Sequence, residues 1–311
     1  MRDWDVLALG ELNLDLVLTG LKSMPVPGHE ILAQRHSLVL GSSTAICAAA
    51  MAGLGLDTHL LAKTGRDLYA RRCLELLREL GVDGSLVRQD PDIQTGVTIS
   101  LSWGEDRALV TYLGAIAALR AEEVDCAVFR RVRHVHVGSY FLQSALRPGL
   151  AELFRKAHEA GATTSLDAGW DDAEVWDYGI REVLRHTDVF FPNELEAAAV
   201  TGRQVVPEAA RELAQYARHV VVKCGGDGAY LVSGERELQL PAYRDIQVVD
   251  TTGAGDSFNA GFLYGFVHGL PLEACMEHGN ACAAISITRL GGAAQCATLE
   301  EVHTVMETGR L

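Results

Sequence analysis

Short apolar runs bounded by glycine or polar residues recur along the chain, and amphipathic stretches of ten or more residues separate most of them. Such runs predict buried strands, and the amphipathic stretches predict helices. Strands that alternate with helices predict a mostly parallel sheet covered on both faces, which is an α/β fold. The expected strands are residues 6–9, 134–137, 163–166, 189–191 and 220–222, and the clearest helices are residues 68–80, 209–218 and 273–289.

Two stretches, at about residues 12–39 and 95–113, depart from this rhythm. Polar and apolar side chains alternate there, as in Val97-Thr98-Ile99-Ser100-Leu101, and a period of two indicates antiparallel strands. Residues 103–107 have the composition of a hairpin turn. We therefore expect a single domain over residues 1–311, in which these two stretches meet as a small second sheet.

Composition limits the partners of the protein. Its 41 acidic residues against 27 basic ones give a formal net charge of −14, which opposes binding to nucleic acid. The amino terminus lacks the basic and apolar regions of a signal peptide, and no stretch is long and apolar enough to span a membrane, so we expect a cytoplasmic protein with no membrane partner. The seven scattered cysteines and 11 histidines have no metal-ligand spacing.

A glycine-rich turn within residues 250–261 is the strongest candidate for chemistry. Residues 246–249 predict a strand before it and residues 257–268 a helix after it. A turn at a helix amino terminus presents free N–H groups and a positive dipole end, which together favour a bound anion such as a phosphoryl group. The residues of this turn are Gly253, Ala254 and Gly255.

Asp256 would follow in the first turn of that helix, close enough to the anion to accept a proton from an incoming hydroxyl. The helix terminus should favour its ionised form. An ordinary strand-to-helix turn with an acidic residue near the cap is the alternative interpretation. Neither the P-loop pattern nor the dinucleotide-binding pattern is present.

The run Asp250-Thr-Thr-Gly-Ala-Gly-Asp-Ser-Phe-Asn-Ala-Gly261 resembles the carboxyl-terminal signature of the ribokinase family, also called the PfkB carbohydrate kinases. Four further motifs stand in the family's order: Gly10-Glu-Leu-Asn-Leu-Asp15, Lys63-Thr-Gly-Arg-Asp67, Phe191-Pro-Asn-Glu-Leu-Glu196 and Lys223-Cys-Gly-Gly-Asp-Gly228. The resemblance implies a ribokinase-like three-layer α/β/α core, a β-sheet lid, and ATP with Mg²⁺ as cofactors. It also implies phosphate transfer to an alcohol, with Asp256 as the base and residues 253–255 as the anion hole.

The acceptor side is expected near the start of the chain. Glu11, Asn13 and Asp15 alternate with leucines, so a strand would place three polar groups on one face, which suits sugar hydroxyls. By the resemblance, Asp15 would hold these hydroxyls. A second acceptor segment matches the family's Gly-Gly-x-x-x-Asn pattern only in part, because serine replaces the second glycine and isoleucine replaces the asparagine, which makes the pocket less polar on that side. The aligned positions are Gly41, Ser42 and Ile46.

The resemblance places a further set of residues on the nucleotide side. One member, Glu196, would organise Mg²⁺ through water, and Asn193 with Glu196 also has the spacing of a helix capping box. The glycines after Lys223 equally suit a hairpin turn. The set is Asn193, Glu196, Lys223, Gly225, Gly228 and Asn280.

Asp250 and Thr252, with residues 288–291, correspond to a loop in which several members of the family bind a monovalent cation. Potassium is therefore a candidate cofactor. A carboxylate that simply closes a turn is the structural alternative. A further departure is Gly169, which stands where many relatives carry an asparagine.

The leading hypothesis is ATP-dependent phosphorylation of a primary hydroxyl of a monosaccharide or sugar acid. A sugar-phosphate kinase would need extra cations, for which Lys63 and Arg107 are the candidates, and a nucleoside kinase would need an aromatic clamp in the lid. A non-catalytic sugar-binding protein is the alternative outside enzymes. We expect a homodimer formed through the lid. Aromatic residues that could stack on a sugar are Trp103, Tyr140, Phe141 and Trp170.

Overall fold

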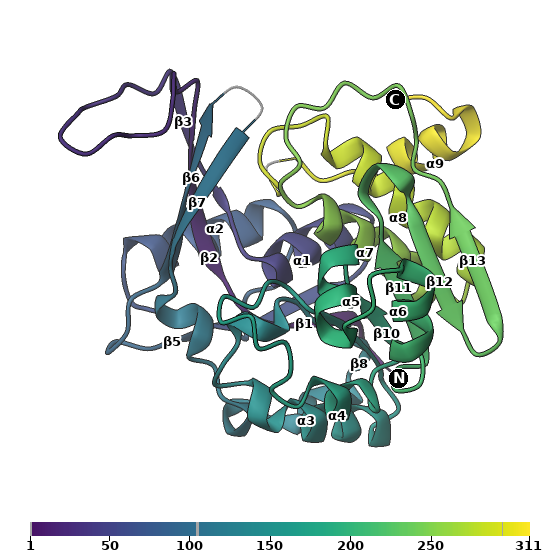
Figure 1. Ribbon diagram of the computed structural model, residues 1–311. Coiled ribbons are helices and arrows are strands. Elements are labelled where there is room, and N and C mark those ends of the chain that lie inside the picture. The colour runs from purple at the N-terminus through teal and green to yellow at the C-terminus, as the bar shows by residue number, and fades with distance from the viewer. Residues whose placement is uncertain (1, 104–105, 294) are drawn as a thin grey trace.

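The computed structural model describes residues 2–103, 106–293 and 295–311, and within them a nine-stranded sheet forms the centre of the fold (Figure 1). The strand order is β13-β12-β11-β10-β9-β8-β1-β4-β5, and the pairs from β11 to β5 are parallel, whereas β12 and β13 add antiparallel strands at one edge. This confirms the α/β fold. The strands are β1 (Trp4–Gly10), β4 (Thr58–Thr64), β5 (Arg88–Gln89), β8 (Val132–Val137), β9 (Thr163–Asp167), β10 (Val189–Phe191), β11 (His219–Lys223), β12 (Ala229–Ser233) and β13 (Arg236–Leu240).

Helices cover both faces of this sheet, because successive side chains of each buried strand point to opposite sides. In β10, Phe190 packs into the core beneath α3, α4 and α6, whereas Val189 and Phe191 pack into the core beneath α1, α7, α8 and α9. The longer helices are α1 (Ser43–Gly53), α2 (Leu68–Glu79), α3 (Arg147–Glu159), α4 (Ile180–Leu184), α5 (Glu194–Thr201), α6 (Val206–Leu213), α7 (Ala254–Val267), α8 (Leu272–Ser286) and α9 (Leu299–Thr308).

A second, four-stranded sheet projects beside α2 (Figure 1). Its order is β3-β2-β6-β7, and the parallel pair between β2 and β6 joins two antiparallel pairs. The two alternating stretches of the sequence therefore do meet in space. The strands are β2 (Asn13–Thr19), β3 (Arg35–Leu40), β6 (Gly96–Trp103) and β7 (Asp106–Tyr112), and residues 104 and 105 of the expected hairpin turn lie outside the described residues.

The strand expected at residues 246–249 is wrong. Among the described residues this segment pairs with no strand; instead, the N–H groups of Val249 and Asp250 both donate to the Ile287 carbonyl oxygen, at 2.7 and 3.2 Å. Val248 and Val249 are 56% and 53% exposed. The expected helix at 209–218 also extends too far, because α6 ends at Leu213 and the chain turns before β11.

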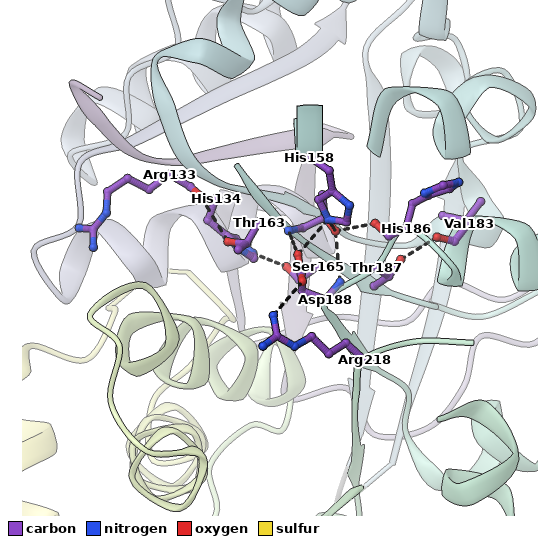
Figure 2. Close-up of polar contacts among 11 residues, drawn as sticks. Arg133, His134, His158, Thr163, Ser165, Val183, His186, Thr187, Asp188 and Arg218 are labelled. Atoms are coloured by element: carbon purple, nitrogen blue, oxygen red, sulfur yellow. Dashed lines mark hydrogen bonds and ion pairs between the residues drawn. The ribbon is translucent and has the colours of Figure 1, made fainter. Parts of the chain in front are cut away.

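Hydroxyl groups of β9 hold the ring of His134 in β8, among the polar contacts drawn in Figure 2. The two ring nitrogens of His134 contact the hydroxyls of Thr163 and Ser165 at 2.8 and 2.7 Å, and the ring packs edge-on against Phe266 of α7. His134 is thus a fully buried core residue. The parts of the chain that the structure describes hold no cluster of three or more histidine, cysteine, aspartate or glutamate side chains suited to a metal, and no helix able to cross a membrane.

Candidate functional site

The glycine-rich turn forms the amino terminus of α7, which begins at Ala254 rather than Ser257. Gly253 caps the helix with φ of 73°, a left-handed conformation that favours glycine. A Cβ atom at this position would also lie 2.7 Å from the Cα of Gly292 and 3.0 Å from Cγ2 of Ile46. The turn therefore requires a glycine on conformational and steric grounds, and its helix terminus provides the dipole end expected for an anion site.

Asp256 lies in the first turn of α7 and accepts a 2.5 Å hydrogen bond from the hydroxyl of Ser43, the first residue of α1. Its protein surroundings remove hydration, and together with the negative charge of Asp167 they raise its pKa to about 7. The hydrogen bond from Ser43 and the charge of Lys223 oppose this shift. We expected the helix terminus to favour the ionised carboxyl, but the net effect of the surroundings is to raise the pKa of Asp256. A pKa near neutrality nevertheless suits a general base.

A cavity of about 190 Å³ lies between the smaller sheet and the turn. Hydrogen bonds from Asn13 join polar side chains of the cavity wall. The Nδ2 atom of Asn13 donates to Asp15 Oδ1 at 3.0 Å and to Thr98 Oγ1 at 3.3 Å. Burial raises the pKa of Asp15 to about 6, against the effect of those neighbours. The lining includes Glu11, Asn13, Asp15, Ser42, Ser43, Thr98, Ser100, Thr111, Ser139, Thr252 and Gly253.

The second acceptor segment lies around this cavity. A Cβ atom at Gly41 would approach Asp15 Oδ1 to 2.0 Å, so glycine is needed for the observed position of the carboxylate. Ser42 caps α1, accepting from the Ala45 N–H, and its hydroxyl donates to the Glu11 carbonyl oxygen at 2.8 Å. Ile46 is only 4% exposed and supports the turn beneath Gly253, so within the described chain it is not part of the cavity wall.

A second cavity, of about 350 Å³, lies on the other side of the turn. Its floor is the hairpin between β11 and β12, where Gly225 and Gly228 have φ of 52° and 91°. Asn280 reaches it from α8 and donates to the Pro241 carbonyl oxygen at 3.0 Å. Most of the remaining wall is apolar, as a ring system such as adenine would require. The lining includes Lys223, Gly225, Gly226, Gly228, Tyr243, Ile246, Val248, Thr251, Ala254, Gly255, Phe258, Asn280 and Ile287.

Lys223 lies against the first turn of α7, since a Cβ atom at Gly255 would be 3.4 Å from its Nζ atom. It forms an ion pair with Asp167 at the end of β9, and Asn259 Nδ2 donates to the same carboxylate oxygen at 2.7 Å. Burial alone would lower the pKa of Lys223, but Asp167 and Glu196 raise it. Lys223 therefore remains charged beside the turn.

Sequence reasoning did not assign Asp167 or Asn259 to the site. Asn259 follows Asp256 by three residues, so the two share a helix face, and a polar residue in this otherwise apolar helix was the available signal. Gly169 adjoins Asp167, because its N–H donates to Asp167 Oδ1 at 3.1 Å. A Cβ atom at Gly169 would lie 2.7 Å from the Cα of Ser139. An asparagine at this position would need a shift of the backbone around Ser139.

Asn193 and Glu196 form the capping box of α5, with reciprocal hydrogen bonds of 2.8 Å between each backbone N–H and the other side chain. The helix capping box, which was the structural alternative for this motif, is therefore present. Glu196 is also buried, and this burial, together with the charge of Asp167, raises its pKa to about 7. The charge of Lys223 opposes the shift, and the backbone bridge between Asn193 and Lys223 places this motif beside the same charged cluster.

The carboxylate of Asp250 closes the loop before α7. Its Oδ1 atom accepts from the Thr252 N–H and its Oδ2 atom from the Gly291 N–H, each at 2.9 Å. These two hydrogen bonds close the turn, which was the structural alternative to a cation site. They join the turn to residues 288–291, as the sequence suggested.

Several other candidates lie elsewhere. Lys63 pairs with Glu123 at 2.7 Å and approaches Asp90 at 3.8 Å, and the side chain of Arg107 is outside what the structure describes. Tyr140 and Phe141 are core residues, so the suggestion that they stack on a sugar is wrong. Trp170 is half exposed and packs edge-on against Trp176.

Comparisons with known proteins identify the family and the fold of the chain. The family model described as "pfkB family carbohydrate kinase" matches residues 4–299. The chain is 35% identical over 299 residues to the ATP-dependent ribose-1-phosphate kinase of Halopiger xanaduensis, covering 92% of this chain and 93% of that protein. Its fold matches Arabidopsis thaliana ribokinase solved with ribose and ATP (TM-score 0.84, 24% identity, 98% and 99% of the two chains). It also matches an E. coli structure solved with ATP and Mg²⁺ (TM-score 0.86, 20% identity, the same coverage).

Proposed function

Because the chain belongs to the pfkB family of carbohydrate kinases and is an ATP-dependent sugar kinase, we propose that it transfers the γ-phosphate of ATP to a primary hydroxyl of a monosaccharide or sugar acid. One observation carries this assignment. The turn of Gly253, Ala254 and Gly255 separates the polar cavity from the apolar one, and Asp256 follows it directly.

In this mechanism the acceptor binds against Asn13 and Asp15, and its reacting hydroxyl approaches Asp256. The carboxylate of Asp256 accepts the hydroxyl proton, and Ser43 holds that carboxylate in position. The amides at the start of α7 and the ammonium group of Lys223 stabilise the negative charge that spreads over the transferred phosphoryl oxygens.

The residues present also suit Mg²⁺. This ion prefers oxygen ligands and in kinases is held by one or two carboxylates together with substrate phosphates, so a dedicated protein cluster is not required. The buried carboxyl of Glu196 near Asp167 and Lys223 supplies such a group, acting through water. Bound Mg²⁺ would neutralise phosphate charge. A monovalent ion such as K⁺ would belong beside Asp250 and Thr252, whose loop adjoins the anion turn.

The charge of the acceptor cavity favours an uncharged sugar. The carboxylate of Asp15 lies in its wall, and no lysine, arginine or aromatic side chain is among the described residues that line it. An aromatic clamp for a nucleoside is thus missing from the described part of the cavity. A sugar-phosphate kinase remains the second candidate, because the relative at 35% identity acts on ribose 1-phosphate.

The test is ADP release by the purified protein across uncharged sugars, sugar acids, nucleosides and sugar phosphates, with Asp256→Asn as the control. We expect release with an uncharged sugar and a loss of roughly 10²- to 10⁴-fold in kcat for the variant. Equal release by wild type and variant would contradict the mechanism. A clear preference for a sugar phosphate would instead establish the second candidate.

We further infer that the smaller sheet acts as a lid and forms a homodimer. Its cavity side carries the row Val39, Asp15, Thr98 and Thr111, which are paired across the four strands. The adjacent row must face away from the cavity, because side chains alternate along each strand. This outer row is entirely apolar, and an apolar outer face favours a second subunit over water. Its residues are Leu38, Leu16, Ile99 and Val110.

A further inference from the structure

Glu11 has an unsatisfied carboxyl oxygen in the wall of the acceptor cavity. It follows β1 at the carboxyl edge of the sheet and is only 2% exposed. Its Oε1 atom accepts from the Thr44 N–H at 3.3 Å, whereas Oε2 is buried and has no hydrogen-bond partner among the described residues. Buried polar atoms are usually paired, and an unpaired one costs free energy. The cavity is the available place for the missing partner.

The location of Glu11 relates it to the reacting atoms. Thr44, which holds Glu11, and Ser43, which holds Asp256, are neighbours at the amino terminus of α1. Asn13 and Asp15 follow Glu11 along the chain and line the same cavity. Glu11 therefore shares a cavity wall with the residues proposed to hold the acceptor, and its partner Thr44 adjoins Ser43, the partner of the residue proposed to remove the proton.

We propose, on the basis of the proposed function, that Glu11 determines acceptor specificity by forming a hydrogen bond from Oε2 to an oxygen of the sugar next to the reacting hydroxyl. This requirement selects a polyhydroxylated acceptor with an oxygen at that position. An analogue that lacks the oxygen would leave Oε2 unpaired, and a site built for such a bond rejects an analogue of this kind.

The direction of the bond follows from the state of the carboxyl. Burial raises the pKa of Glu11 to about 8, and the negative charges of Asp256 and Asp167 add to the effect, while the Thr44 N–H and the nearby Ser139 hydroxyl, which is not placed to form a hydrogen bond with Oε2, oppose it. Glu11 thus carries a proton at neutral pH. Because Oε1 already accepts a hydrogen bond, the proton belongs on Oε2, which then donates to the sugar.

The test compares three variants. Glu11→Gln keeps an acceptor for the Thr44 N–H and a donor in place of Oε2, whereas Glu11→Leu removes both. Thr64→Val is the matched control, because Thr64 also has a buried hydroxyl without a partner in the described chain but is not among the residues lining the cavity. The measurements are kcat and KM for the best acceptor of the panel and for its monodeoxy analogues, KM for ATP, and Tm.

We expect Glu11→Leu to raise the acceptor KM roughly tenfold or more, with the KM for ATP unchanged and with Glu11→Gln close to wild type. For one monodeoxy analogue, wild type and Glu11→Leu should have the same KM. The wild-type acceptor KM should rise as the pH passes about 8, where Glu11 loses its proton, and that of Glu11→Gln should not. Thr64→Val should match wild type throughout.

Equal losses for Glu11→Leu with every analogue, or a pH response shared by Glu11→Gln, would overturn the proposal and leave Glu11 a structural residue. A wild-type protein that phosphorylates nothing in the panel would contradict the proposed function instead. Infrared difference spectra then decide on Glu11 without turnover. The carbonyl-stretch band of a protonated carboxyl should disappear in Glu11→Gln, and its absence from wild type at neutral pH would overturn the proposal.

Discussion

The hydroxyl of Ser43 donates a 2.5 Å hydrogen bond to Asp256 across 213 residues of sequence, and this bond opposes the burial that raises the pKa of Asp256 to about 7. Replacing Ser43 by alanine removes the opposing effect, so the pKa of Asp256 should rise further. The base acts in its ionised form, and activity therefore falls as the pH drops through its pKa. We expect the acid limb of the kcat profile to move to higher pH in Ser43→Ala, with roughly fivefold lower kcat at neutral pH. Ser43→Thr keeps the hydroxyl and should retain the wild-type limb; an unmoved limb in the alanine variant would contradict the assignment.

A substitution at Gly41 tests the acceptor side of the proposed site separately from the ATP side. An alanine there would place Cβ 2.0 Å from Asp15 Oδ1, and the carboxylate would have to move. Gly41→Ala should raise the acceptor KM roughly tenfold or more while the KM for ATP stays the same. Gly84→Ala is the control, because its Cβ would meet Leu77 at 3.3 Å and Gly84 is not among the residues lining the cavity. A parallel rise in both KM values would show a general disturbance.

The ion pair of Lys223 and Asp167 should be needed for stability. Asp167→Asn would leave a buried ammonium group without its partner, which costs about 3–5 kcal/mol of unfolding free energy. Glu152→Gln removes a partner of Arg155 on the surface and should leave the free energy of unfolding nearly unchanged, because water screens this pair. Urea denaturation measures both, and similar midpoints for the two variants would rule out a buried, tightly coupled pair.

Glu196 offers a test of the proposed Mg²⁺ role that leaves the fold intact. Glutamine can still accept the N–H of Asn193, so Glu196→Gln should keep the capping box of α5. We expect the Mg²⁺ concentration for half-maximal activity to rise several-fold while the acceptor KM is unchanged. Glu301 has the same position in the capping box of α9, and Glu301→Gln should leave the Mg²⁺ dependence unaltered. Identical titrations for the two variants would remove Glu196 from the metal site.

The outer face of the lid predicts the assembly. Light scattering of the wild type should give twice the mass of one chain. Val110 is 57% exposed, and Val110→Glu would place a charge in the apolar row, so it should yield monomers. Val175 is equally exposed outside the lid, and Val175→Glu should remain dimeric. A monomeric wild type at assay concentration would refute the inferred dimer.

The sequence was sufficient for the architecture because its periodicities are local. The alternation of short apolar runs and helical stretches predicted the parallel sheet, and the two alternating stretches predicted the smaller sheet. The failed strand at residues 246–249 shows the limit of this reasoning. Ile246 and Val248 line the larger, mostly apolar cavity of about 350 Å³, and no local pattern separates a cavity wall from a buried strand.

Site residues could be predicted where they belong to one continuous motif. The prediction was incomplete where the site depends on the packing of residues that are distant in the sequence. Asp256 and its turn were found from adjacent residues, but the hydrogen bond between Asn259 and Asp167 joins positions 92 residues apart. The pKa of Asp256 likewise depends on burial and on Asp167, neither of which its own helix terminus reveals.

The two cavities also divide the chain. Most of the acceptor wall, from Glu11 to Ser139, comes from the first half of the sequence, whereas the nucleotide-side wall comes wholly from Lys223 onward. Substitutions in the first half of the sequence can therefore change the preferred sugar while the residues proposed to bind ATP stay unchanged. Such separation makes this fold well suited to the evolution of new acceptors by local sequence drift.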